Sequence, residues 1–151
     1  MNEDTLKEFI LQNSTRILLC GLSCIGKTHF KHFLKSQGLY HLISKISSCN
    51  KFYPESRLNE KIVVQLSGEH KGAIIIGAPW GIWKERRLLR RVYHRGSRFA
   101  ADPVAFKETY IKCINKLEEY NIPHIFIDNR NDCPILDKTS FLTMITEESY
   151  E

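Results

Sequence analysis

Two glycines, a lysine and a threonine near the amino-terminal end form the clearest chemical pattern of the sequence. Residues 16–30 read RILLCGLSCIGKTHF and fit Gly-x-x-x-x-Gly-Lys-[Ser/Thr] without a mismatch, from Gly21 to Thr28. Glycines let several backbone N–H groups turn toward one anion, and the start of a helix adds partial positive charge. The lysine of this pattern reaches the outer phosphates of a nucleotide, and the hydroxyl binds Mg²⁺. The pattern therefore predicts a nucleotide-phosphate site.

The order of elements around this pattern is the one that phosphate binding needs. An apolar run over 16–20 is typical of a buried strand, and apolar residues from Phe30 onward recur at helical spacing. We name residues 21–27 the phosphate loop and expect ATP and Mg²⁺ as ligands, with Lys27 on the phosphates and Thr28 on the metal. The residues expected to bind the nucleotide are Gly21, Leu22, Ser23, Cys24, Ile25, Gly26, Lys27 and Thr28.

A strongly basic segment lies in the middle of the chain. Residues 84–98, KERRLLRRVYHRGSR, hold seven Lys or Arg and one Glu, whereas the whole chain has a formal charge of +5. The ordinary explanation of such a run is a solvated helix face. In a chain with a phosphate loop we favour a lid helix, because transferred phosphoryl groups need cationic contacts. A strip that binds the nucleic-acid backbone is the alternative interpretation.

Composition indicates one domain and gives no sign of a membrane partner. The chain has 151 residues, 42% of them hydrophobic, and no apolar run long enough to span a bilayer. The start, Met1 to Gln12, is amphipathic and does not follow the pattern of an export signal. Five cysteines lack a Cys-x-x-Cys pair, which favours free thiols over disulfides or zinc. We expect a single cytoplasmic domain over residues 1–151.

Apolar periodicity predicts strands that alternate with helices. This alternation favours an α/β fold in three layers, with a parallel sheet of about 4–5 strands covered on both faces. Ligands of such sheets bind at the carboxyl ends of the strands, where the phosphate loop would lie. The expected strands are 16–20, 39–47, 72–80 and 124–129, and the expected helices are 3–13, 27–37, 54–67, 80–95, 102–120 and 138–148.

Three further stretches follow the phosphate loop in an order shared with known kinases. They are Pro79-Trp80 after an apolar run, Arg91 to Gly96 (RVYHRG), and Pro103 with a helical pattern behind it. Together with residues 21–28, this order resembles the 5′-kinase domain of phage polynucleotide kinases, within the wider family of small P-loop nucleoside and nucleotide kinases. The resemblance implies a P-loop NTPase fold with a basic lid helix.

The same resemblance implies an activity and roles for individual residues. It implies transfer of the γ-phosphoryl group of ATP to a nucleotide, nucleoside or nucleic-acid acceptor. By this resemblance, Lys27 stabilises the phosphates, Thr28 holds Mg²⁺, and Arg91 and Arg95 clamp the transferring group. The absence of an Asn-Lys-x-Asp pattern argues against a GTPase switch.

Two acidic residues of that family are missing here. Its members place an Asp after the second strand, whereas residues 45–57, KISSCNKFYPESR, have Glu55 as their first carboxylate. The apolar run 72–80 also lacks the usual acid for Mg²⁺. A monophosphate acceptor needs a positioned base less than a hydroxyl does, so the gap favours a nucleotide acceptor or Glu55 as a substitute base. A nucleotide-binding regulatory or degenerate module and a nucleic-acid-binding ATPase are the alternatives.

Other polar and aromatic residues have ordinary explanations. Asp128 and Asn129 follow an apolar run, where they could shape a base pocket, although a turn at a strand end is commoner. Trp80 and Trp83 could stack on an acceptor base or pack in the core. The six histidines show no spacing suited to a metal site.

Overall fold

We analysed a computed structural model of the chain. The structure describes residues 6–10, 17–21, 25–39, 41, 46–48, 72–90, 103–130 and 132–147. The expected helix 54–67 lies outside these ranges, as does the end of the expected lid helix beyond residue 90.

The described strands form one five-stranded sheet in the order β2-β1-β3-β4-β5. Neighbouring strands from β2 to β4 run parallel, with Ile17 of β1 opposite Ile46 of β2 and Gly72 of β3. β5 runs antiparallel to β4, and Phe126 lies opposite Leu136. The strands are β1 (Ile17–Cys20), β2 (Ile46–Ser48), β3 (Gly72–Gly77), β4 (His124–Asp128) and β5 (Ile135–Leu136). The α/β class is confirmed, but the expectation of a wholly parallel sheet was wrong.

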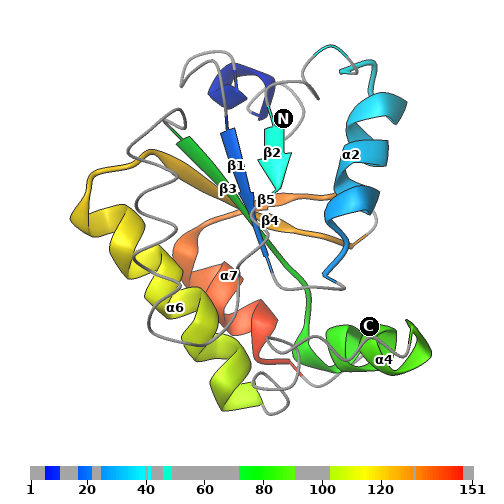
Figure 1. Ribbon diagram of the computed structural model, residues 1–151, viewed down its shortest axis with the longest axis vertical. Coiled ribbons are helices and arrows are strands. Elements are labelled where there is room, and N and C mark those ends of the chain that lie inside the picture. Colours follow the sequence, from blue (N-terminus) through cyan, green and yellow to red (C-terminus); the bar gives the residue numbers. More distant parts are fainter. Residues whose placement is uncertain are drawn as a thin grey trace.

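Helices cover both faces of this sheet (Figure 1). Side chains alternate along β1, so that Leu18 and Cys20 belong to one apolar cluster and Ile17 and Leu19 to the other. One cluster includes side chains of α6 (Pro103–Glu119) and α7 (Lys138–Ile145), and the other includes α2 (Lys27–Ser36) and helical residues 6–10. The described residues therefore form three layers, as the sequence predicted.

The helix boundaries follow from local sequence signals. α2 ends before Gly38, whose φ of 75° suits a residue without a side chain. α6 begins at Pro103, where a missing N–H costs no helical hydrogen bond. α7 begins after Asp137, whose side chain accepts a hydrogen bond of 2.7 Å from the backbone N–H of Ser140. α4 (Trp80–Arg90) begins where the lid helix was expected.

The expected strand 39–47 is wrong over its first residues. Leu39 lies just beyond α2, and its N–H donates to the carbonyl oxygen of Leu34 in the last turn of the helix. His41 lies in a helical turn, and the strand that the structure describes is Ile46–Ser48. Leu39 is nevertheless buried against the α2 side of the sheet, so its apolar character served packing rather than strand pairing.

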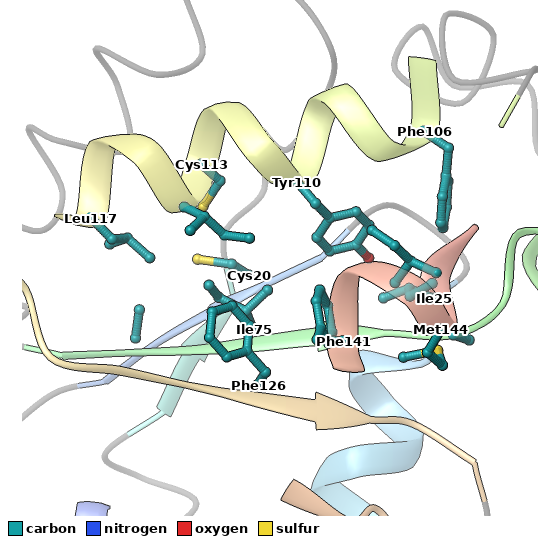
Figure 2. Close-up of a cluster of buried hydrophobic side chains, with 14 of the residues drawn as sticks. Cys20, Ile25, Ile75, Phe106, Tyr110, Cys113, Leu117, Phe126, Phe141 and Met144 are labelled. Atoms are coloured by element: carbon teal, nitrogen blue, oxygen red, sulfur yellow. The ribbon is translucent and has the colours of Figure 1, made fainter. Parts of the chain in front are cut away.

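A row of aromatic rings fills the space between the sheet and α6 (Figure 2). Trp83 is fully buried and its ring lies 5.0 Å from that of Phe106. Tyr110 follows at 5.4 Å, and Phe141 of α7 lies 5.5 Å from Tyr110. Because Trp83 has no exposed surface, its expected role in the core is confirmed, and this role fixes the first turns of α4 against α6.

Gly77, the last residue of β3, allows α7 to approach the sheet closely. A Cβ atom at this position would lie 2.6 Å from Cζ of Phe141 and 2.8 Å from Cγ2 of Ile145. We expect Gly77→Ala to lower the free energy of unfolding by about 1–3 kcal/mol, because overpacking forces neighbours to move. Phe141→Leu removes the crowding ring atoms, so it should cost less in Gly77→Ala than in the wild type. Urea unfolding of the four proteins measures this coupling, and strictly additive losses would contradict the steric explanation.

Candidate nucleotide-phosphate site

The carboxyl ends of three parallel strands meet at one edge of the sheet. β1 ends at Cys20, β3 at Gly77 and β4 at Asp128. The chain passes from β1 to β2 on one side and continues from β3 to β4 on the other, so the strand order reverses between β1 and β3. Ligands of doubly wound sheets bind at such a reversal, outside the carboxyl ends of the strands. The phosphate loop begins at this point.

Gly21 begins the loop in a position that excludes any side chain. A Cβ atom there would lie 2.7 Å from Cγ2 of Ile25 and 3.1 Å from the carbonyl oxygen of Ile76. The chain therefore turns tightly back on itself directly after β1. Ile25 is fully buried and packs with the core beneath α6 (Figure 2), so within the loop only its backbone is placed to meet a ligand.

Gly26 ends the loop in a left-handed conformation and begins α2. Its φ and ψ are 102° and 36°, values that only glycine adopts without strain. Its carbonyl oxygen accepts the first helical hydrogen bond, from the N–H of Phe30 at 3.0 Å. No side chain caps this helix start, and its first turn carries no acidic residue. The partial positive charge of the helix is therefore directed outward without a carboxylate of its own to neutralise it.

Lys27 and Thr28 are the first two residues of α2. Lys27 is partly buried and Thr28 is exposed. The pKa of the buried Cys20 thiol is raised well above its usual value by a hydrogen bond with Cys113 and by burial, and the charge of Lys27 opposes this rise. Lys27 therefore lies close enough to the end of β1 to act electrostatically there. Lys27 and the start of α2 place two sources of positive potential at the same edge of the sheet.

Asn129 lies beneath the phosphate loop. It follows β4, it has no exposed surface, and its Nδ2 donates to the carbonyl oxygens of Ile25 at 2.8 Å and Gly26 at 2.9 Å. The sequence suggested a base pocket or a strand-end turn for this residue and did not indicate the loop contact. The signal that could have found it is an amide side chain directly after a buried parallel strand, at the edge where the loop lies.

The carboxylate at the end of β4 is already paired. Arg130 donates to both oxygens of Asp128, from Nε at 2.9 Å and from Nη2 at 2.8 Å. This hydrogen bonding raises the pKa of Arg130. β3 ends at Gly77 and is followed by Ala78 and Pro79, so no acidic side chain comes directly after this neighbour of β1.

The described residues bring together five of the eight positions expected to bind the nucleotide: Gly21, Ile25, Gly26, Lys27 and Thr28. The other three, Leu22, Ser23 and Cys24, lie outside the described ranges, as do the expected catalytic residues Glu55, Arg91 and Arg95. In the part of the chain that the structure describes, no group of three or more His, Cys, Asp or Glu residues could hold a metal ion.

Cys20, Cys113 and Cys133 are free thiols buried in the protein. This confirms for these three residues the expectation that the cysteines do not form disulfides. Across the described ranges, no helix combines the length and apolar character that crossing a membrane requires.

No protein-family model, curated protein or solved structure matches this chain at a significant level.

Proposed function

We propose that the chain is an ATP-dependent phosphotransferase with a P-loop NTPase fold, which transfers the γ-phosphoryl group to a nucleotide, nucleoside or nucleic-acid acceptor. The observation that carries the proposal is the placement of the motif. Gly21 and Gly26 occupy positions that exclude a side chain or need a left-handed backbone, and Lys27 follows at the start of α2. The structure thus explains why both of these positions of the motif are glycine: Gly21 by lack of space and Gly26 by its backbone conformation.

The fold supports this proposal without being specific to it. The order β2-β1-β3-β4-β5 is that of the flavodoxin-like doubly wound sheets, which also bind phosphate-bearing ligands at the β1/β3 reversal. The topology thus supports a ligand at the phosphate loop, and the Gly-Lys-Thr sequence selects a nucleoside triphosphate with Mg²⁺. Lys27 would contact the phosphates and Thr28 would ligate the metal ion.

A nucleotide-binding module with little catalysis is the second candidate. It is favoured by the end of β3, where Gly77, Ala78 and Pro79 supply no carboxylate for Mg²⁺. The nearest carboxylate on the neighbouring strand, Asp128, is held by Arg130. Such a module would bind Mg²⁺·ATP and leave it intact.

Incubation of the protein with γ-labelled ATP, Mg²⁺ and a panel of acceptors tests these alternatives. The panel comprises nucleoside monophosphates, nucleosides, and DNA or RNA with 5′-hydroxyl ends. Label on an acceptor supports the phosphotransferase, whereas free phosphate whose release depends on nucleic acid supports an ATPase. ATP bound in calorimetry without any turnover supports the binding module. Absence of both binding and turnover contradicts all three functions.

Glu55 is expected to act on the acceptor side if the acceptor is a hydroxyl. Removing a general base costs typically 10²-fold or more, so we expect Glu55→Gln to lower kcat by about that factor and leave ATP affinity unchanged. Steady-state kinetics with the acceptor found above measure both quantities, and Glu69→Gln tests the alternative base. If kcat is unchanged in Glu55→Gln and falls in Glu69→Gln, Glu69 is the base; if both are unchanged, the acceptor is a monophosphate.

A further inference from the structure

The hydrogen bonds of Asn129 connect the phosphate loop to the end of β4, more than a hundred residues away in the chain. A single amide group, Nδ2, donates to two successive loop carbonyls, those of Ile25 and Gly26. Both distances, 2.8 and 2.9 Å, are those of good N–H···O bonds. Asn129 is fully buried, and its bond to the Ile25 carbonyl is buried, whereas its bond to the Gly26 carbonyl is partly buried. Losing the amide would therefore take this partner from the buried Ile25 carbonyl oxygen, while the Gly26 carbonyl oxygen would keep its bond from the N–H of Phe30.

The position of these carbonyls determines where the loop N–H groups point. In a trans peptide the C=O of one residue and the N–H of the next point in opposite directions. The Ile25 carbonyl faces Asn129, so the N–H of Gly26 is directed away from it. The Gly26 carbonyl faces Asn129 and the N–H of Phe30, so the N–H of Lys27 is likewise directed away. Asn129 thus turns two successive N–H groups toward the side from which a phosphate would approach.

Asn129 is itself held by two further hydrogen bonds. Its backbone N–H donates to the carbonyl oxygen of Gly77, at the end of β3, at 2.7 Å. Its Oδ1 accepts from Sγ of Cys133 at 3.4 Å. Burial raises the pKa of the Cys133 thiol to about 12, with a smaller contribution from Asp128. The thiol is therefore protonated at neutral pH and can donate, which fixes Oδ1 toward Cys133 and Nδ2 toward the loop.

We infer that Asn129, oriented by Cys133, is a positioning residue that sets the phosphate-binding conformation of the loop. This inference rests on the proposed function for its ligand, since the phosphates of a nucleotide are what the oriented N–H groups would bind. Its structural part, the bracing of the loop, concerns this chain's own residues and is measurable without any nucleotide. Asn129 would act through the loop and would not touch the phosphates.

Asn129→Leu removes the amide while it keeps a branched side chain with the same number of heavy atoms, and it is the first test. We expect Mg²⁺·ATP affinity in calorimetry to fall about tenfold or more, since hydrogen bonds to buried carbonyls are lost. In the protein without nucleotide, we expect amide exchange in residues 25–30 to become about tenfold faster. Leu117→Val is the control, because it loosens the core near the carboxyl-terminal end of α6, away from Ile25 of the loop (Figure 2). It should change the melting temperature but neither loop exchange nor affinity.

Cys133 provides a milder pair of variants if Asn129→Leu does not fold. Cys133→Ser keeps a donor for Oδ1 of Asn129, whereas Cys133→Ala removes it, so only the alanine variant should speed exchange in the loop and weaken ATP binding several-fold. Loop exchange within twofold of wild type in Asn129→Leu, or in Cys133→Ala where Asn129→Leu does not fold, would overturn the inference. Faster exchange in a protein whose wild type does not bind Mg²⁺·ATP would refute the proposed function and retain the bracing role.

Discussion

Lys27→Ala is expected to lower phosphoryl transfer by about 10²-fold or more while the protein stays folded. Lys27 is the first residue of α2 and is partly exposed, and it belongs to neither apolar cluster. Its removal therefore leaves the core intact and takes one positive charge from the edge where the loop lies. The remaining helix start and loop N–H groups can still hold phosphates, so ATP binding should weaken less than turnover falls.

Lys31→Ala is the matched control for this prediction. Lys31 lies one turn further along α2 and carries the same charge, so its removal changes the net charge equally but acts one helical turn further from the loop. Turnover with labelled ATP, calorimetric affinity for Mg²⁺·ATP and the melting temperature should be measured for all three proteins. If Lys27→Ala keeps the turnover of Lys31→Ala, the Gly-Lys-Thr sequence has no part in catalysis and the proposed mechanism is wrong.

The sequence predicted those elements whose signals are local. The run ILLC of β1 and the run GAIIIG of β3 are fully buried, as expected for strands covered on both faces. The helix behind Pro103 was correctly predicted because its apolar residues recur at helical spacing: Phe106, Tyr110, Cys113, Ile114 and Leu117 are all buried. Gly38 indicated the end of α2 to within one residue, and α7 begins at Lys138 as expected.

One short strand that depends on its neighbouring strand was missed. β5 has two residues, Ile135 and Leu136, too few for any alternation to be seen. It exists because β4 offers an edge to which these residues pair. The sequence suggested that β4 is the last strand of the sheet. Instead β5 follows β4 and pairs with it in antiparallel orientation, so the sheet is mixed rather than parallel.

The sequence predicted the residues of the phosphate loop but not the residue that holds the loop in place. The motif identified Gly21, Gly26, Lys27 and Thr28 because they all lie within eight consecutive positions of the sequence. Asn129 contacts Gly26 and Ile25, which lie 103 and 104 positions before it in the chain. No pattern in a single sequence records such a pairing. The amide of Asn129, at the same edge of the sheet but two strands away from β1, thus supplies a constraint that the glycines alone leave open.

The basic segment that follows Trp80 carries the second large prediction. Arg91 and Arg95 are four residues apart, so on a continued helix they share one face and can grip one phosphate chain. α4 starts at the carboxyl end of β3, the strand beside β1, and Trp83 anchors it in the core. The start of α4 therefore lies at the edge of the sheet where the phosphate loop begins, and a lid helix would have to extend from this point.

We expect Arg91→Ala and Arg95→Ala each to lower kcat by about 10²-fold while ATP affinity changes little, because contacts made only in the transition state speed the reaction. Lys84→Ala is the matched control. It removes one charge from the same segment, at an exposed side chain that lies 4.9 Å from the Trp80 ring centre, and should leave kcat unchanged.

Turnover, ATP affinity and salt-dependent binding to an oligonucleotide should be measured for the three variants. If the segment is instead a nucleic-acid strip, each arginine variant will retain its turnover and flatten the salt dependence by about one phosphate contact. That outcome would remove both arginines from catalysis and favour a nucleic-acid-binding ATPase, since a catalytic clamp cannot be dispensable for the step it stabilises.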